Sequence, residues 1–149
     1  MRPTSSLSQR NHERGQSLPE FAMVLVPFLL LLLGLFDLGG GIYTYNAVSQ
    51  AAREIARSAS VDFQNGASSL GTSADTIQVR NTQKKLVPGL KDSGIQISCV
   101  DIEDVPVGAG CGPGDFVRVR ISVTYSPVTP LLGLTGPFDL VSVSHIEIS

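Results

Sequence analysis

The most prominent pattern along the chain is an uninterrupted apolar run near its start. Residues 21–36 read FAMVLVPFLLLLLGLF and contain no charged side chain. As a helix this run covers about 24 Å, against a hydrocarbon core about 30 Å thick. Residues 38–42 can lengthen the run to the bilayer thickness if the Asp37 carboxylate reaches toward the interface. We therefore predict a transmembrane helix within residues 16–42.

The residues that flank the run indicate its orientation. Tyr43 and Tyr45 follow it where an interfacial aromatic belt is expected, so Asp37, Tyr43 and Tyr45 are predicted to lie at the membrane interface. Three arginines occur within residues 1–15, whereas no lysine or arginine follows the run until Arg53. The positive-inside rule then places the N-terminus in the cytoplasm and the rest of the chain on the far side.

The helical pattern continues beyond the apolar run, through residues 43–60. Small or apolar side chains recur there at three- and four-residue spacing: Ala47, Val48, Ala51, Ala52, Ile55 and Ala59. We expect one helix from Ser17 to about Ser60, whose second half packs on other elements through this stripe. The alternative is a secretory signal peptide, but the run is long, no A-x-A site follows it, and cleavage would leave the continuing helix unexplained.

Residues 61–149 predict a small domain on the far side. A polar stretch is followed by a helix that Ser73 caps and that runs to about Val87. Its modest apolar face is expected to pack on the alanine-rich stripe.

Alternation of apolar and polar residues then predicts strands, clearest in residues 117–125. The other predicted strands lie near residues 95–99 and 141–148, and the register of the last stays open because both of its faces carry apolar side chains. Gly- and Pro-rich loops at 104–114 and 126–137 fit an antiparallel meander. The expected fold class is α+β: a long N-terminal transmembrane-plus-amphipathic helix, a second helix and a sheet of about three strands.

The composition of the chain limits the kinds of binding and catalysis that it can support. A net charge of −2 gives no basic field for nucleic acid. With two cysteines and two histidines, the sequence offers little for a metal site or histidine-centred catalysis, so we predict no catalytic residue, no metal and no cofactor. Cys99 and Cys111 are expected to form a disulfide outside the cytoplasm.

Two further features of the domain have an ordinary structural interpretation. Asp101, Glu103 and Asp104 form a small acidic cluster that could bind calcium, but a solvated loop is the favoured interpretation. His145 is expected to be a surface or core residue of a strand.

Just before the apolar run, Glu20 places a carboxylate at the edge of a membrane helix, where a charge is costly and indicates function. Ser17 and Glu20 also have the spacing of a capping box, and Pro19 fits a first helical turn. A capping role and a functional role for Glu20 are therefore both open.

Residues 14–59 resemble the TadE-like family of bacterial tight-adherence (Flp) pilus systems. The resemblance is carried by a glycine separated from Glu-Phe by four residues, the leucine-rich run with its proline, Asp-x-Gly at 37–39, and Ala-Ala-Arg-Glu-x-Ala-Arg at 51–57. Gly40 departs from the family pattern, which often has a basic residue there.

This resemblance implies a pseudopilin. A prepilin peptidase would cut after Gly15, leaving Gln16 as the new N-terminus, with Phe21 a neighbouring residue of the cleavage motif. Glu20, then the fifth residue, would pair with the amino terminus of a neighbouring subunit. In a low dielectric an ammonium and a carboxylate strongly favour meeting, because either alone is costly.

The resemblance therefore implies a non-enzymatic assembly subunit of the cytoplasmic membrane with a periplasmic or extracellular domain. Its expected partners are the lipid bilayer, a prepilin peptidase, other pilin or pseudopilin subunits and inner-membrane pilus assembly proteins. Two alternatives remain: an uncleaved membrane scaffold of the same machinery, and a secreted binding domain or enzyme released by signal peptidase.

Overall fold

The computed structural model describes residues 17–64, 70–107, 111–127, 129 and 136–149. In chain order its elements are α1 (Ser17–Gln64), α2 (Ala74–Leu86), the 3₁₀ turn η1 (Asp92–Gly94), β1 (Ile95–Val100), β2 (Phe116–Tyr125) and β3 (Phe138–Glu147). The strands form one antiparallel sheet in the order β1-β2-β3. The predicted α+β fold and its meander are confirmed.

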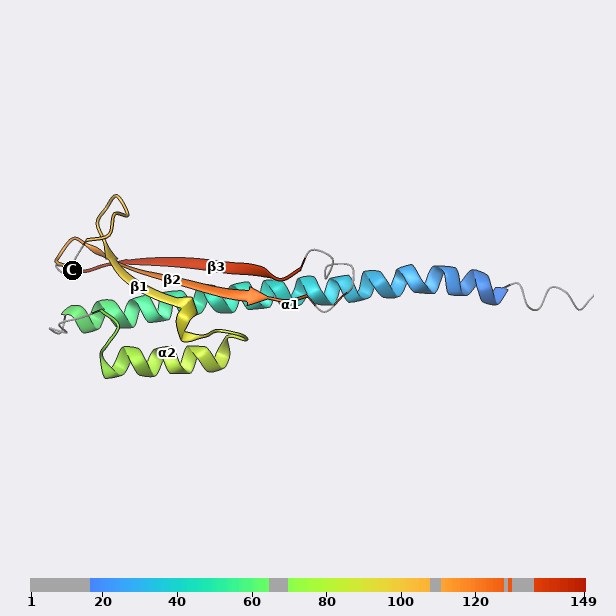
Figure 1. Cartoon of the computed structure of the whole chain (residues 1–149), viewed down its shortest axis with the longest axis horizontal. Coiled ribbons are helices and arrows are strands. Elements are labelled where there is room, and N and C mark those ends of the chain that lie inside the picture. Colours follow the sequence, from blue (N-terminus) through green and yellow to red (C-terminus); the bar gives the residue numbers. More distant parts are fainter. Residues whose placement is uncertain (1–16, 65–69, 108–110, 128, 130–135) are drawn as a thin grey trace, which may run out of the picture.

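Helix α1 is a single rod of 48 residues with Pro27 inside it. At 1.5 Å per residue it is about 72 Å long. The sheet and α2 pack along its C-terminal half, and its N-terminal half projects alone (Figure 1). By its length and composition α1 could cross a membrane, and 6% of its most apolar 18-residue stretch is buried within the protein.

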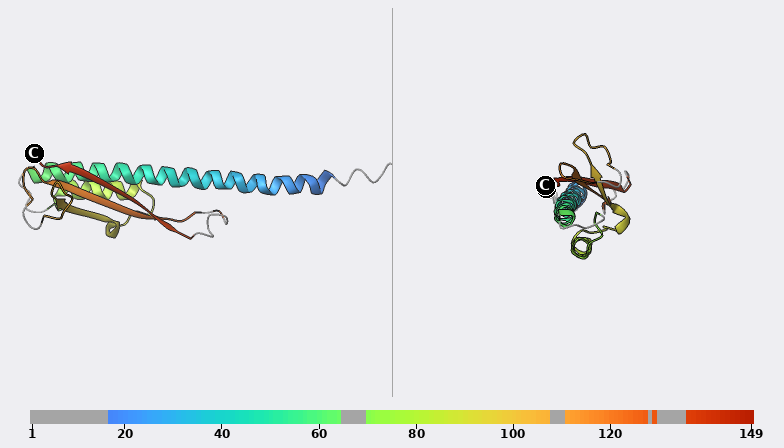
Figure 2. Two further views of the ribbon diagram at one scale, coloured as in Figure 1. Left: turned by 90° about the horizontal axis from the view of Figure 1, so that it is seen from above. Right: turned by 90° about the vertical axis from the view of Figure 1, so that its left-hand side faces the viewer.

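The core forms where the second half of α1 lies against the sheet (Figure 2). The predicted stripe supplies fully buried Val48, Ala52 and Ile55. Across from it, β2 contributes Val117, Val119, Ile121 and Val123, which are at most 2% exposed. The alanines of α1 let its backbone approach the sheet closely, so that a small domain can be well packed.

Pairing with β2 sets the register of β3, which the sequence had left open. Ser144 lies opposite Val119 and Ser142 opposite Ile121, so the two serines share the face that is turned to α1. Val143 lies opposite Arg120 on the outer face and is 44% exposed. Small side chains thus occupy the middle of the face on which β3 contacts α1, between Leu140 and Ile146.

Helix α2 packs on α1, as predicted, and Ser73 is its N-cap, accepting a hydrogen bond from the Thr76 amide at 3.1 Å. The contact is more polar than an apolar stripe would give. Thr76 is fully buried, its hydroxyl lies 3.1 Å from that of Ser58, and it also donates to the Asp62 carboxylate. Ile77 remains 43% exposed. Hydrogen bonds therefore take the place of part of the apolar face that α2 lacks.

The predicted disulfide between Cys99 and Cys111 is present, with the two Cα atoms 5.9 Å apart. Cys99 is on the core face of β1, opposite Val117. The bond ties the end of β1 to the segment that leads into β2.

Replacing Cys99 and Cys111 together with alanine is expected to lower the free energy of unfolding of the domain by about 3 kcal/mol, because the unfolded chain regains the freedom of the open loop. Chemical denaturation of the full chain in detergent micelles, followed by circular dichroism, measures the change. The wild-type protein in reducing agent is the matched control and should behave like the variant. Equal stability of oxidised protein and variant would contradict the prediction.

Candidate assembly and membrane-interface site

The predicted site residues fall into two groups along α1. Glu20 and Phe21 lie in its first turns, whereas Asp37, Tyr43 and Tyr45 lie where the helix meets the domain. Gly15 and Gln16, the predicted processing site, lie outside the described residues. From Glu20 to Asp37 the helix rises about 26 Å.

Glu20 is exposed on α1 and has no hydrogen-bond or ion-pair partner among the described residues. Apolar side chains surround it: Leu18 is 74% exposed, Phe21 65% and Val24 65%. In hydrocarbon, a carboxylate in such surroundings has to be neutralised by a proton or a cationic partner. The side chain of Ser17 is not among those described, so the capping box stays a prediction.

Asp37 is held by hydrogen bonds from the α+β domain. It is 6% exposed, and its Oδ2 accepts hydrogen bonds from the Thr129 backbone N–H at 2.7 Å and from the Thr129 hydroxyl. Tyr125, the last residue of β2, donates from its hydroxyl to the Asp37 carbonyl at 2.9 Å. The end of the sheet is thereby tied to the helix where the projecting apolar half begins.

The glycines that follow Asp37 make room for this contact. A Cβ at Gly40 would lie 2.8 Å from the Tyr125 hydroxyl oxygen, and one at Gly41 would lie 3.9 Å from the Tyr125 ring. Any side chain at position 40 would therefore displace Tyr125. The Gly40 departure from the family pattern coincides with a close approach of the sheet to α1.

Tyr43 and Tyr45 are 64% and 49% exposed, respectively. Tyr45 lines a groove between α1 and the end of the sheet, together with Phe138 and Leu140 of β3. A membrane-interface position for Asp37, Tyr43 and Tyr45 stays a prediction.

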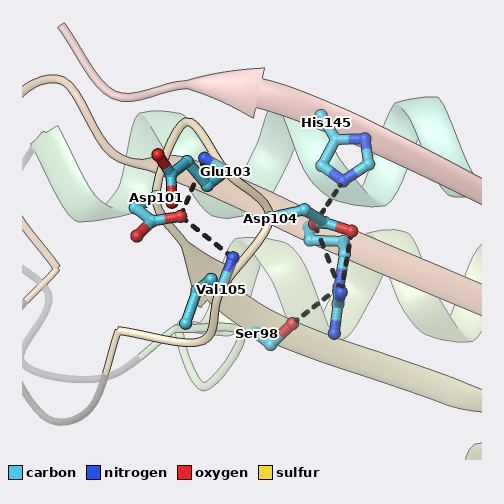
Figure 3. Close-up of polar contacts among 7 residues, drawn as sticks. Ser98, Asp101, Glu103, Asp104, Val105 and His145 are labelled. Atoms are coloured by element: carbon cyan, nitrogen blue, oxygen red, sulfur yellow. Dashed lines mark hydrogen bonds and ion pairs between the residues drawn. The ribbon is translucent and has the colours of Figure 1, made fainter.

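The acidic cluster fastens its own loop to the sheet (Figure 3). Asp101 Oδ1 accepts from the backbone N–H groups of Glu103 and Val105, each at 2.9 Å. Asp104 contacts His145 Nε2 at 3.0 Å and Arg118 at 3.2 Å. His145 is thus a residue of the sheet surface.

The hydrogen bond with His145, followed by the nearby Arg118 charge, lowers the pKa of the Asp104 carboxyl below its ordinary value of 3.8. The stabilising effect of these contacts is therefore complete above the ordinary value and is lost as pH falls through the lowered one. His145→Phe is expected to raise the pKa of Asp104 toward 3.8, as measured by NMR titration of its carboxyl carbon. Val143→Phe, on the same face of β3, is the control, and equal pKa values in both variants would contradict this cause.

Cys99, Cys111 and Asp115 bring ligand-type atoms within 4.8 Å of one another. Both sulfur atoms belong to the disulfide, however, so neither is a thiolate that could bind a metal. Asp115 accepts a hydrogen bond from the Gly112 amide at 2.8 Å. This group therefore stabilises the turn before β2.

Fold and site together define an α+β domain built on one half of a long helix, whose other half is exposed, apolar and carries a carboxylate near its start. The family model described as TadE-like protein matches residues 15–57. The resemblance predicted from the sequence is thereby confirmed over the apolar half of α1 and most of its packed half, and it supports involvement in tight-adherence pilus assembly. Comparisons with curated proteins and with solved structures gave no match.

Proposed function

We propose that this chain is a pseudopilin-like, non-enzymatic subunit of a tight-adherence pilus assembly machine, processed by a prepilin peptidase after Gly15. The observation that carries the proposal is the construction of α1. One continuous helix presents Glu20 on an exposed apolar half and uses its other half as the core of a folded domain. The family match begins at residue 15, the glycine at which processing is proposed.

In the membrane, the apolar half of α1 stores the subunit, with residues 1–15 in the cytoplasm and the α+β domain on the far side. The arginines of residues 1–15 support this orientation by the positive-inside rule. The helix is unbroken from the apolar half into the domain, so the two move as one rod. A force on the domain is therefore transmitted to the membrane-spanning half of α1. Transfer of the subunit from the bilayer to the base of the filament requires this.

Processing creates the partner that Glu20 needs. The new amino terminus at Gln16 carries a positive charge close to the membrane boundary, and the Glu20 of an adjacent subunit supplies the negative one. Each charge alone in hydrocarbon is costly, and the pair relieves both costs. Glu20 thus favours side-by-side helices over isolated ones, and contacts of the exported domain select which pilin or assembly protein is the neighbour.

The N-terminus of the mature protein tests the processing step. Mass spectrometry of the chain purified from cells with the peptidase is expected to find Gln16 first, whereas Gly15→Leu retains residues 1–15. Gly34→Leu is the matched control, because a Cβ at Gly34 meets nothing within 4 Å and that glycine is far from the proposed cut. An intact N-terminus in the wild-type protein would instead support the uncleaved scaffold.

The same measurement addresses release by signal peptidase, which predicts a mature start beyond about residue 40 and a water-soluble product. Proteolysis favours exposed, irregular segments. Between the apolar run and the domain, the chain is helical throughout, and Asp37 and Thr44 are already buried there. This continuity is the reason that we favour the anchored subunit.

A further inference from the structure

An apolar groove lies where α1 meets the end of the sheet, here called the foot (Tyr125, Pro127, Phe138 and Leu140). The helix side of the groove consists of Leu38, Gly41, Ile42 and Tyr45, with Asp37 at its edge. Its volume is about 300 Å³. The Tyr125 and Phe138 rings lie 5.4 Å apart and form its sheet side.

The groove is lined by apolar side chains that the described part of the chain leaves exposed. Leu38 is 57% exposed, Ile42 62% and Phe138 46%. Asp139, which follows Phe138, lies on the other face of β3, where it accepts a hydrogen bond from the Thr124 hydroxyl at 2.7 Å. Asp37, the one carboxylate at the edge, is hydrogen-bonded by Thr129. The groove therefore suits an apolar, uncharged occupant.

The length of the helix places this groove at the membrane. Residues 21–36 alone cover about 24 Å, less than the hydrocarbon thickness of about 30 Å, whereas residues 21–42 cover about 33 Å. With Glu20 at one boundary, the span reaches the other near Gly40. Asp37 then lies within the outer part of the hydrocarbon layer, and the foot lies at its outer boundary.

The contacts of Asp37 lower the cost of placing its carboxylate at such a depth. An unpaired carboxylate at that level would be drawn toward water. Here Asp37 is 6% exposed and accepts two hydrogen bonds from Thr129, so the protein itself provides polar partners. The hydrogen bonds of Asp37 with Thr129 and Tyr125 also hold the foot against the helix.

We propose that the foot of the sheet dips into the outer leaflet and that phospholipid acyl chains fill the groove. This inference rests on the proposed membrane span. Lipid is favoured because the groove is continuous with the exposed apolar surface of α1, on which Leu35 and Phe36 are 65% and 77% exposed. The domain is accordingly seated in the membrane surface rather than held above it, and leaving the bilayer exposes the groove.

Tryptophan quenching tests the depth, because the chain contains no tryptophan. Three single variants of the full chain, Phe138→Trp, Phe36→Trp and Ile102→Trp, are reconstituted in phosphatidylcholine vesicles with or without bromine on the acyl chains. Phe36 probes the span, and Ile102, which is 86% exposed beyond the other end of the sheet, probes the aqueous side. Circular dichroism establishes that each variant is folded.

We expect brominated lipid to quench Phe138→Trp to an extent comparable with Phe36→Trp, and to leave Ile102→Trp unquenched. Quenching of Phe36→Trp alone would overturn the seated foot and leave the span intact. Absence of quenching in Phe36→Trp as well as in Phe138→Trp would overturn the span itself. Blue-shifted emission of Phe138→Trp that depends on protein concentration, without quenching, would show that a second copy fills the groove and would overturn the lipid assignment.

Discussion

Replacing Glu20 with glutamine is expected to leave the chain in the membrane but to abolish its assembly with other pilin-like subunits. Glutamine keeps the size and polarity of the side chain and removes the charge. Removing one partner of an ion pair that is buried between helices costs roughly 3–5 kcal/mol, or more than a hundredfold in association. The measurement combines membrane fractionation with a count of surface pili in cells that carry the variant as their only copy.

Glu54→Gln is the matched control, because Glu54 is also an exposed carboxylate of α1 but belongs to the half that packs in the domain. It should leave piliation unchanged. Normal piliation with Glu20→Gln would remove the case for the charge pair. Loss of the variant from the membrane fraction would show that Glu20 acts in insertion instead.

Replacing Ile55 with alanine is expected to lower the free energy of unfolding of the α+β domain by about 2–5 kcal/mol, since it opens a cavity in a packed core. Ile55 is fully buried between α1 and the elements that cover it. Thermal unfolding of the full chain in detergent micelles, monitored by near-ultraviolet circular dichroism, measures the loss. The variant should remain in the membrane fraction, because the apolar half of α1 does not depend on the sheet.

Ile77→Ala is the control for Ile55→Ala, with the same side chain removed from a position on α2 that is 43% exposed. Ile77→Ala should lower the free energy of unfolding by only a small fraction of the loss caused by Ile55→Ala. Equal losses for the two variants would contradict the proposed core, in which the stripe of α1 is the central element.

Local patterns predicted most of the fold because they follow from periodicity. The alternation in β2 placed Val117, Val119, Ile121, Val123 and Tyr125 on one face; the first four are buried and Tyr125 is half-buried. The three- and four-residue spacing in residues 43–60 likewise identified the packed face of α1. In each case a single element carries the whole signal, so no knowledge of its neighbours is needed.

Such local patterns could not predict contacts between residues that are far apart in the sequence. The sequence placed Asp37 at a boundary, but its hydrogen bond with Thr129 joins residues 92 positions apart. The register of β3 followed only from pairing with β2. The buried side of α2 centres on Thr76, whose hydroxyl is satisfied by α1 and whose burial no hydrophobic pattern predicts. The sequence did give one indication of the contact between α1 and the sheet, namely Asp37, a charged residue inside an apolar stretch.

For the candidate site, the chemistry of Glu20 could be read from its position at the edge of the apolar run, whereas its partner could not. The partner charge is proposed to come from another subunit after processing, so it is not encoded in a contact within one chain. The structure adds that Glu20 is exposed and has no ion-pair partner among the residues it describes. An exposed carboxylate is available for contact with a neighbouring helix.

We propose that α1 anchors the chain in the lipid and carries the domain to the far side. Labelling of Ile102→Cys with a membrane-impermeant maleimide in intact spheroplasts, followed by a carbonate wash of the membranes, tests it directly. Ile102 is 86% exposed, and the native cysteines are already joined to each other. We predict labelling without permeabilisation and recovery of the labelled chain in the washed membrane pellet. Release into the carbonate supernatant, or labelling only after permeabilisation, would contradict the account.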